Sequence, residues 1–336
     1  MREHLSIWQQ ELANGFTSAN ELLAFLSIAP EEYAAGIEQK FKTRVPKNFA
    51  RRMQPGNRYD PLLLQVLATQ DEMLESVDFV LDPLDERSTN KLPGLIHKYY
   101  GRVLLTVTGV CAVNCRYCFR RNFSYTDNNP GKVGWQKVID YIGDDQSISE
   151  VILSGGDPLL ATDTTLAYFL EKLSAIQHVK TVRIHTRIPV VLPSRITDKL
   201  CDLLQLSRLR KVIVLHSNHP NELDNSVYNA CQQLRNADCH LLNKSVLLKN
   251  VNDDAHILAV LSDKLFTYGV LPYYLHILDQ VKGAAHFALS YEYVLELFAK
   301  LQTLLPGYLV PRLVKEESHM PNKTIYGKNL LTKDCE

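Results

Sequence analysis

The chain has 336 residues, of which 46% are apolar and 22% charged, and its 37 Lys and Arg balance 37 Asp and Glu. This composition is typical of a globular protein with one large domain and a smaller region beside it. A net charge of zero argues against nucleic acid as a partner but allows a local basic patch. Because there is no long apolar stretch and no signal-peptide pattern at the start, we expect a cytoplasmic protein without membrane contact.

Residues 1–95 are predicted to form an N-terminal helical region. The stretches 18–26 and 60–74 repeat apolar residues at three- and four-residue spacing, and Ser18 with Glu21 could form a capping box. Several prolines divide the region into short pieces. Nothing in it suggests catalysis, beyond a surface for a substrate or partner.

Short apolar runs alternate with helix-like segments over residues 96–308. The runs span residues 102–109, 150–157, 181–187, 211–218, 240–248 and 270–278, and the segments between them include 135–145, 164–176, 221–237 and 291–305. Continuously apolar runs at this spacing predict parallel strands buried on both faces. Many end in polar residues, at the edge where α/β barrels carry their sites. We therefore predict an α/β fold, a partial (βα)6 TIM-like barrel, followed by a C-terminal segment over residues 309–336.

Cys111, Cys115 and Cys118 form a C-x3-C-x2-C motif just after the first predicted strand. Three thiolates can hold three irons of a [4Fe–4S] cluster and leave the fourth iron open, whereas an electron carrier normally closes all four. A structural zinc site would need a fourth ligand nearby, and the next histidine is His178. The motif favours a cluster with an open iron. A zinc knuckle and a non-catalytic iron–sulfur protein are the alternatives.

The segment SGGDPL follows the second predicted strand at residues 154–159. Its two glycines allow the backbone to approach a ligand closely. Gly-Gly-Asp-Pro is also a good turn, so the segment is weak evidence alone. Its place one strand–helix unit after the cysteines makes a ligand-binding role the better interpretation.

These features resemble the radical S-adenosylmethionine (SAM) superfamily, in which SAM binds the open iron and is cleaved to a 5′-deoxyadenosyl radical. From about residue 44 to residue 325 the chain resembles the lysine 2,3-aminomutase family, through HKYYGRVLL, CAVNCRYCFRR, SGGDPLL, RIHTRIPVVLPSRIT, SNHPNE, NKSVLLKNVND and LPYYLHILDQVKGAAHF. LPYYLHILD, KGAAHF, GYLVP and the lack of a long segment after Lys323 favour the shorter branch that modifies elongation factor P. The resemblance implies an isomerase that converts (S)-α-lysine to β-lysine, in the (R) form for this branch.

The resemblance implies three cofactors: a [4Fe–4S] cluster on Cys111, Cys115 and Cys118, SAM, and pyridoxal 5′-phosphate (PLP) bound to Lys323. The family's cofactor-binding positions fall on Arg102 and Lys98 for the PLP phosphate, and on Ser154, Gly155, Gly156, Asp157 and His216. Its substrate-binding positions fall on Arg120 for the lysine carboxylate, and on Asp279 and Glu316 for the ε-ammonium.

The sequence departs from the longer family members at several positions. A lysine, Lys98, stands where they have a second arginine, Lys244 replaces a glutamine, and His276 replaces a tyrosine. Ser318–His319 replaces a Gly-Gly pair, and Asp254 stands where they have a zinc-binding cysteine, so we expect no zinc and a different assembly.

The family also implies partners and leaves alternatives open. It implies an electron donor such as flavodoxin and a functional link to an elongation factor P ligase, and a homo-oligomer is compatible with the sequence. The main alternative is a lysine 2,3-aminomutase of free lysine catabolism or a relative acting on another amino acid. The second alternative is a radical SAM enzyme that does not use PLP.

Overall fold

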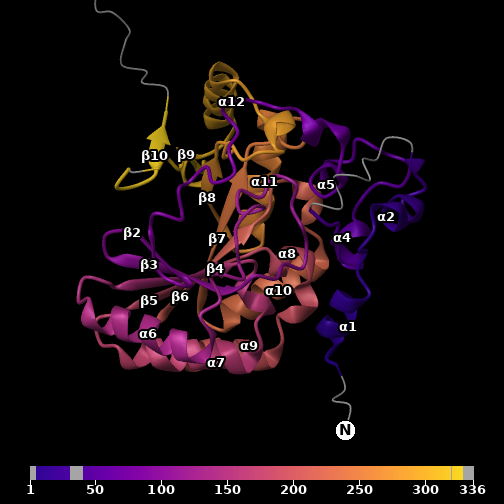
Figure 1. Cartoon of the computed structure of the whole chain (residues 1–336). Helices are drawn as coiled ribbons and strands as arrows, with labels where there is room; N and C mark the ends of the chain where they lie inside the picture. The colour runs from indigo at the N-terminus through magenta and orange to yellow at the C-terminus, as the bar shows by residue number, and fades with distance from the viewer. Residues whose placement is uncertain (1–4, 31–40, 319, 328–336) are drawn as a thin grey trace, which may run out of the picture.

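The computed structural model describes residues 5–30, 41–318 and 320–327. Its centre is a ten-stranded sheet whose strands are hydrogen-bonded in chain order (Figure 1). The parallel strands are β3 (Arg102–Thr108), β4 (Glu150–Gly155), β5 (Thr181–Thr186), β6 (Arg210–His216), β7 (Cys239–Val246), β8 (Leu271–His276) and β9 (Arg312–Lys315). Strands β3 to β8 are the six predicted from the sequence. The predicted partial α/β barrel is confirmed, and β9 extends it by one parallel strand.

Antiparallel strands close both ends of the sheet. At one end, β1 (Asn90–Leu92) pairs with β2 (Leu95–Tyr99), and β2 pairs with β3. Gly101 has a φ of 75°, which lets the chain turn back from β2 into β3. At the other end, β10 (Thr324–Tyr326) pairs with β9. The sheet therefore includes part of the segment predicted as helical and part of the C-terminal segment; the domain boundaries at residues 95 and 308 remain predictions.

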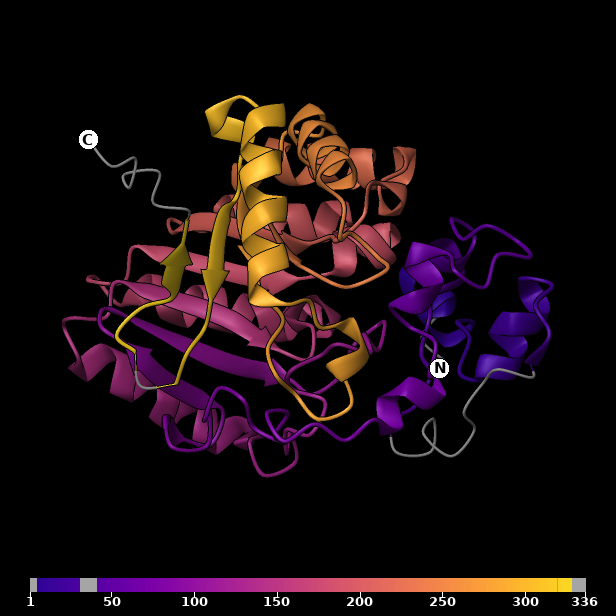
Figure 2. The same cartoon turned by 90° about the horizontal axis from the view of Figure 1, so that it is seen from above.

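Helices join the parallel strands and cover the outside of the sheet (Figures 1 and 2). The long ones are α6 (Gly131–Asp144), α7 (Asp163–Ala175), α9 (Asp198–Leu206), α10 (Asn225–Asn236), α11 (Ala255–Thr267) and α12 (Tyr291–Leu304). Short ones near the strand ends are η3 (Pro158–Leu160), α8 (Ile188–Val191), η4 (Pro193–Arg195), η5 (Pro220–Glu222), η6 (Ala285–Phe287) and η7 (Gly307–Leu309). Asp254 accepts hydrogen bonds from the backbone of His256 and Ile257 and so caps α11.

The N-terminal helices lie together at one side of the barrel, and β9 and β10 lie at another (Figures 1 and 2). They are α1 (Ile7–Ala13), α2 (Ala19–Phe25), α4 (Lys47–Ala50), α5 (Pro61–Leu64) and η2 (Gln70–Met73). Ser18 precedes α2, but its side chain makes no capping hydrogen bond. No helix in the described residues is both long and apolar enough to cross a membrane.

The stretch 60–74, with its helical spacing of apolar residues, forms two short helices, α5 and η2. Asp60 starts α5 by accepting hydrogen bonds from the backbone of Leu62 and Leu63. The helix ends at Leu64, and the carbonyl of the next residue, Gln65, accepts a hydrogen bond from the Arg116 backbone at 2.8 Å. This contact joins the end of α5 to the cysteine loop.

Candidate active site

A cavity of about 380 Å³ lies at the carboxyl ends of the parallel strands. Every site residue predicted from the sequence lines it: Lys98, Arg102, Cys111, Cys115, Cys118, Arg120, Ser154, Gly155, Gly156, Asp157, His216, Asp279, Glu316 and Lys323. These residues span more than 200 positions of the chain, so the fold brings them to one place; their individual roles remain predictions.

The cysteine loop follows β3 and forms one wall of the cavity. Burial is the main reason that the pKa of Cys118 is raised, to about 11, and that the pKa of Cys111 lies well above its usual value. Iron would reverse this preference, because a thiol that binds a metal is deprotonated. Among the described residues, no group of three or more Cys, His, Asp or Glu side chains is placed so that it could bind a single metal ion. A cube-shaped cluster does not require this, since each thiolate binds a different iron.

Gly155 and Gly156 lie where the backbone of β4 passes the start of the cysteine loop. A Cβ atom on Gly155, which has a φ of +118°, would lie 2.4 Å from the carbonyl oxygen of Thr108. One on Gly156 would lie 2.4 Å from the carbonyl oxygen of Val110. Close strand packing alone therefore requires both glycines, in addition to any contact with a cofactor.

Asp157 holds two strand ends together. Its carboxylate accepts hydrogen bonds from Leu159 N, from Thr186 Oγ1 at 2.7 Å and from Arg187 N at 2.7 Å. Burial raises the pKa of Asp157 to about 6, and these hydrogen bonds oppose the rise. Both oxygens are thus engaged by the chain itself.

Arg187, which the sequence analysis did not select, contacts the cysteine loop directly. Its Nη1 lies 2.8 Å from the sulfur of Cys115, and its Nη2 donates to Gln65 at 2.7 Å and to Glu222 at 3.0 Å. Tyr117 joins the same buried network. The Tyr117 hydroxyl lies 3.1 Å from Nε2 of His216, whose pKa is lowered mainly by burial.

Lys323 and Glu316, which lie between β9 and β10 in the chain, form an ion pair in the same cavity. Glu316 also pairs with Lys98 at 3.3 Å and accepts a hydrogen bond from the Tyr99 hydroxyl at 3.0 Å. Burial alone would raise the pKa of Glu316, but Lys323 and Lys98 lower it to about 2. Glu316 therefore links the predicted PLP lysine to a predicted phosphate ligand.

Two predicted ligand-binding residues have buried atoms without a hydrogen-bond partner in the described structure. They are Nε of Arg102 and Oδ1 of Asp279. Burial, and then the nearby Glu316 carboxylate, raise the pKa of Asp279 to about 7. An unpaired buried polar atom is costly unless a ligand satisfies it.

Arg120 is already paired within the chain. Its Nε and Nη2 bind both oxygens of Glu86, at 2.7 and 2.6 Å, and its Nη1 donates to Ser154 at 3.1 Å. Glu86 carries no recognisable signal in the sequence, because it lies in a polar segment without a periodic pattern. Nη1 also donates to the carbonyl of Gly155 at 3.4 Å, so a substrate carboxylate would share a guanidinium that already binds Glu86, Ser154 and Gly155.

Lys244 is a third lysine that lines the cavity, with Lys98 and Lys323. Burial, followed by the charges of Lys323 and Arg120, lowers its pKa to about 8. His276 and His185 line the same wall, and burial lowers the pKa of each well below its usual value. The Ser318–His319 departure lies partly outside the described residues, which do not include His319.

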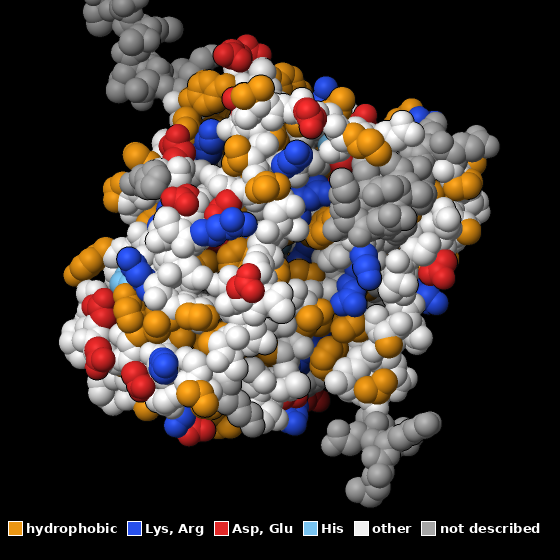
Figure 3. Space-filling model, viewed as in Figure 1, with side chains coloured by type: hydrophobic (Ala, Val, Ile, Leu, Met, Phe, Trp, Pro, Cys, Tyr) orange, Lys and Arg blue, Asp and Glu red, His pale blue; other side chains and the backbone are white. Residues whose placement is uncertain are grey.

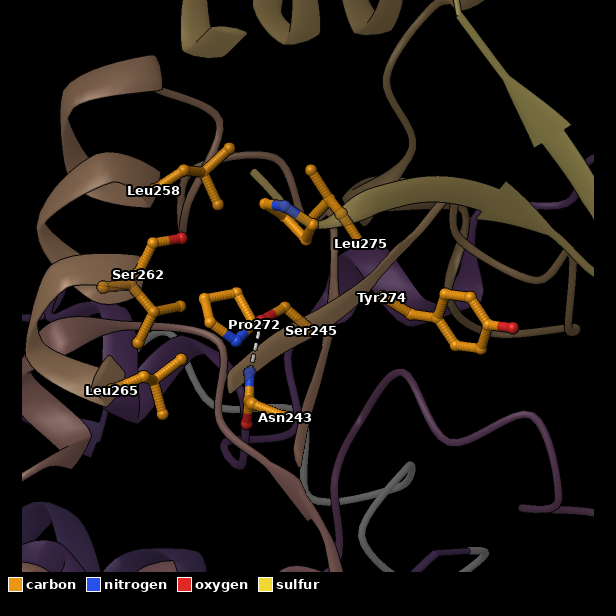
Figure 4. A pocket seen from close by; sticks show the side chains of 10 residues that line it. Asn243, Ser245, Leu258, Ser262, Leu265, Pro272, Tyr274 and Leu275 are labelled. Atoms are coloured by element: carbon orange, nitrogen blue, oxygen red, sulfur yellow. Dashed lines mark hydrogen bonds between the residues drawn. The ribbon is translucent and has the colours of Figure 1, made fainter. Parts of the chain in front are cut away.

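A separate small cavity of about 10 Å³ lies between α11 and strands β7 and β8 (Figure 4). Leu258, Leu265 and Leu275 point toward it, and Asn243 donates a hydrogen bond to Ser245 at its edge. It is an apolar packing gap with space for at most one water molecule.

The Radical SAM superfamily model matches residues 105–257, which contain the cysteine loop and strands β4 to β7. This match and the barrel with its open cavity define the class as a radical SAM protein. The chain is 47% identical over 323 residues to an L-lysine 2,3-aminomutase of Haemophilus influenzae, covering 96% of each. It is 48% identical over 320 residues to one of Escherichia coli, covering 94% of this chain and 93% of the relative. It is 33% identical over 311 residues to a glutamate 2,3-aminomutase of Clostridioides difficile, covering 91% of this chain and 72% of the relative.

The chain belongs to the L-lysine 2,3-aminomutase family and is an isomerase of the radical SAM type. A [4Fe–4S] cluster and SAM follow from this family. The three cysteines of the loop after β3 are the residues that would hold the cluster.

Proposed function

We propose that the chain converts (S)-α-lysine to β-lysine. The observation that carries this proposal is Asp279, a buried carboxylate with an unpartnered oxygen in the same cavity as Lys323. A distal ammonium group, as in lysine, would satisfy this oxygen. A distal carboxylate, as in glutamate, would be repelled by Asp279 and Glu316.

Arg120 and the two acids would hold the two ends of the substrate. Arg120 lies beside the cysteine loop and Ser154, and its guanidinium would bind the lysine carboxylate in addition to Glu86. Asp279 would receive the ε-ammonium, assisted by Glu316. Fixing both ends brings a single carbon of the substrate close to the cluster side of the cavity, which is how positioning accelerates a reaction.

The residues around Lys323 fit PLP. The unpartnered Nε of Arg102 and the amine of Lys98 supply positive charge for a phosphate. Tyr273 and Tyr274, stacked with ring centres 3.7 Å apart, line the same cavity. Lys244 is the other lysine in the cavity that could bind PLP covalently. Of the two, Lys323 is the one that shares a carboxylate, that of Glu316, with Lys98.

When bound, SAM on the cluster supplies a hydrogen-abstracting radical and PLP supplies an electron-delocalising ring for migration of the amino group. The chain supplies placement and charge. Glu316 orients the Lys323 amine, and Asp279 and Arg120 orient the substrate. Residues of the sheet and of the cysteine loop line the cavity. They would limit the access of water to the radical formed there.

We further propose that the product is (R)-β-lysine for modification of elongation factor P, with a ligase as the next enzyme. The segments LPYYLHILD, KGAAHF and GYLVP support this. The alternative is the same reaction in free lysine catabolism. A homo-oligomer and a flavodoxin-type electron donor are part of the proposal.

The test is anaerobic incubation of the reconstituted protein with SAM, PLP, dithionite and either L-lysine or L-glutamate. We expect β-lysine, with the (R) form identified by chiral chromatography, and no β-glutamate. Asp279→Asn should lower turnover of lysine strongly, whereas Asp202→Asn, on the exposed side of α9, should not. Adding elongation factor P and its ligase should consume the product; if only the (S) form appears and is not consumed, the elongation factor assignment is wrong.

A further inference from the structure

A groove separate from the central cavity reaches the cysteine loop from outside. It has a volume of about 430 Å³ and is lined by Thr17, Lys42, Thr43, Arg44, Gly109, Val110, Cys111 and Asn114. Cys111 is the one cluster cysteine that lines both the groove and the central cavity. Val110, next to it, is 47% exposed. The groove is therefore a direct approach to a cluster ligand that does not pass through the substrate cavity.

A basic segment is held against the cysteine loop at this groove. Asn114 donates from its backbone to the carbonyl of Arg44 at 3.0 Å and from its side chain to the carbonyl of Lys42 at 2.8 Å. In return, Nη1 of Arg44 donates to the carbonyl of Cys111 at 3.1 Å. These contacts fix the positive charges of the segment beside the cluster position.

The segment is strongly basic although the chain is neutral. Between residues 40 and 59 there is no Asp or Glu, and the cations are Lys40, Lys42, Arg44, Lys47, Arg51, Arg52 and Arg58. Lys42, Lys47 and Arg51 are exposed and make no ion pair within the described part of the chain. Lys and Arg side chains lie over the region of α4 on the face drawn in Figure 3.

We propose that this groove, which Lys42 lines, and the exposed Lys47 and Arg51 at the adjoining helix α4 form the docking surface of a flavodoxin, an acidic flavoprotein that reduces the cluster. The inference rests on the proposed function, because it requires a catalytic cluster that must be reduced. One electron passes from the reduced flavin to the oxidised cluster, and no atom is transferred. Electron-transfer complexes have small, transient interfaces, and opposite charges raise their association rates by 10-fold or more. The exposed Val110 would provide the apolar contact at the centre of such an interface.

The test compares two reductants on the reconstituted holoenzyme. Stopped-flow measurements would follow cluster reduction by reduced flavodoxin and by dithionite, at low and high salt. In Lys42→Glu/Lys47→Glu/Arg51→Glu we expect flavodoxin to reduce the cluster at least about 10-fold more slowly at low salt, with no change for dithionite. The matched control, Lys137→Glu/Lys180→Glu/Arg210→Glu, places the same charge change on α6 and at the amino ends of β5 and β6, and should behave as wild type.

Equal flavodoxin rates in the triple variant and wild type would overturn the docking surface, as would equal slowing in the control. If the triple variant does not retain its cluster, the rates of cluster reduction by flavodoxin and by dithionite are compared in the single variant Lys42→Glu instead, with the same expected result. Loss of RNA binding in the triple variant, with unchanged reduction by flavodoxin, would also overturn the proposal in favour of a nucleic-acid surface. Failure of dithionite to support β-lysine formation in wild type would instead refute the proposed function.

Discussion

The guanidinium of Arg187 donates a hydrogen bond to the sulfur of Cys115 over 2.8 Å. Arg187 follows β5, is 6% exposed, and is fixed in place by Glu222 and Gln65. This contact joins the end of a barrel strand and the N-terminal segment to the cysteine loop. Because of this contact, we expect Arg187 to affect the reduction potential of the cluster.

Replacing Arg187 by glutamine should make the cluster harder to reduce. A hydrogen bond to a charged group contributes about 1.5 kcal/mol or more, so its loss should lower the reduction potential by roughly 60 mV or more for one electron. Redox titration followed by electron paramagnetic resonance measures the shift. Arg187→Lys, which retains the charge, should shift the potential less. An unchanged potential in a glutamine variant with a full cluster would show that the hydrogen bond does not act on it.

Borohydride reduction of the PLP-loaded protein should label Lys323 and not Lys244. Lys244 has a pKa of about 8 and is the more reactive free amine, but it lacks the phosphate-binding neighbours Lys98 and Arg102. Peptide mass spectrometry locates the label. Lys323→Ala should abolish labelling, and Lys244→Ala should keep it. Label on Lys244 in wild type would contradict the assignment.

The affinity for lysine should increase as the pH rises through 7. The pKa of Asp279 is raised to about 7, so its carboxyl group is neutral below this pH and attracts the ε-ammonium only above it. Between pH 6 and pH 8 the dissociation constant of lysine should fall up to about 10-fold, while the ε-ammonium itself stays charged. Equilibrium dialysis without reductant measures this change. A profile that is equally steep in Asp279→Asn would exclude Asp279 as its cause.

Glu72 should be essential for stability of the fold around the cysteine loop. Its carboxylate binds Nε and Nη2 of Arg116 and Nη2 of Arg121, each at 2.6 Å, and is almost fully buried. Glu72→Ala leaves two buried cations without this partner and should lower the free energy of unfolding by about 3–5 kcal/mol. Urea unfolding measures the loss, with the exposed Glu75→Ala as control. Similar unfolding midpoints for the two variants would contradict the role of Glu72.

The sequence was most informative where one physical signal dominates. Apolar runs predicted β3 to β8. The expectation that these strands are buried on both faces was wrong for β5 and β7, in which less buried residues alternate with buried ones, because Arg183, His185 and Lys244 line the cavity. The C-x3-C-x2-C spacing and SGGD located the cluster end of the cavity. The resemblance to the family selected Lys323 and Asp279, which no local pattern distinguishes from surface charges.

The missed residues are those whose role depends on distant partners. Gln65 contacts Arg187, 122 positions away, and Glu86 pairs with Arg120, 34 positions away. Both lie in the N-terminal region, which suggested no catalysis. Arg187 follows a predicted strand but resembles any other cation at a strand end. Such side chains carry no periodic or spacing signal, so only the folded chain reveals them.

Migration of the amino group by a radical route is tested most directly by incubating the reconstituted protein with L-lysine deuterated at carbon 3, SAM, PLP and reductant. Mass spectrometry and nuclear magnetic resonance would locate deuterium in the product. We predict β-lysine that carries deuterium transferred to carbon 2, as expected for an amino-group migration in which hydrogen moves by radical transfer. If no β-lysine forms, or if carbon 2 of the β-lysine carries only hydrogen from water, the proposed radical migration is wrong.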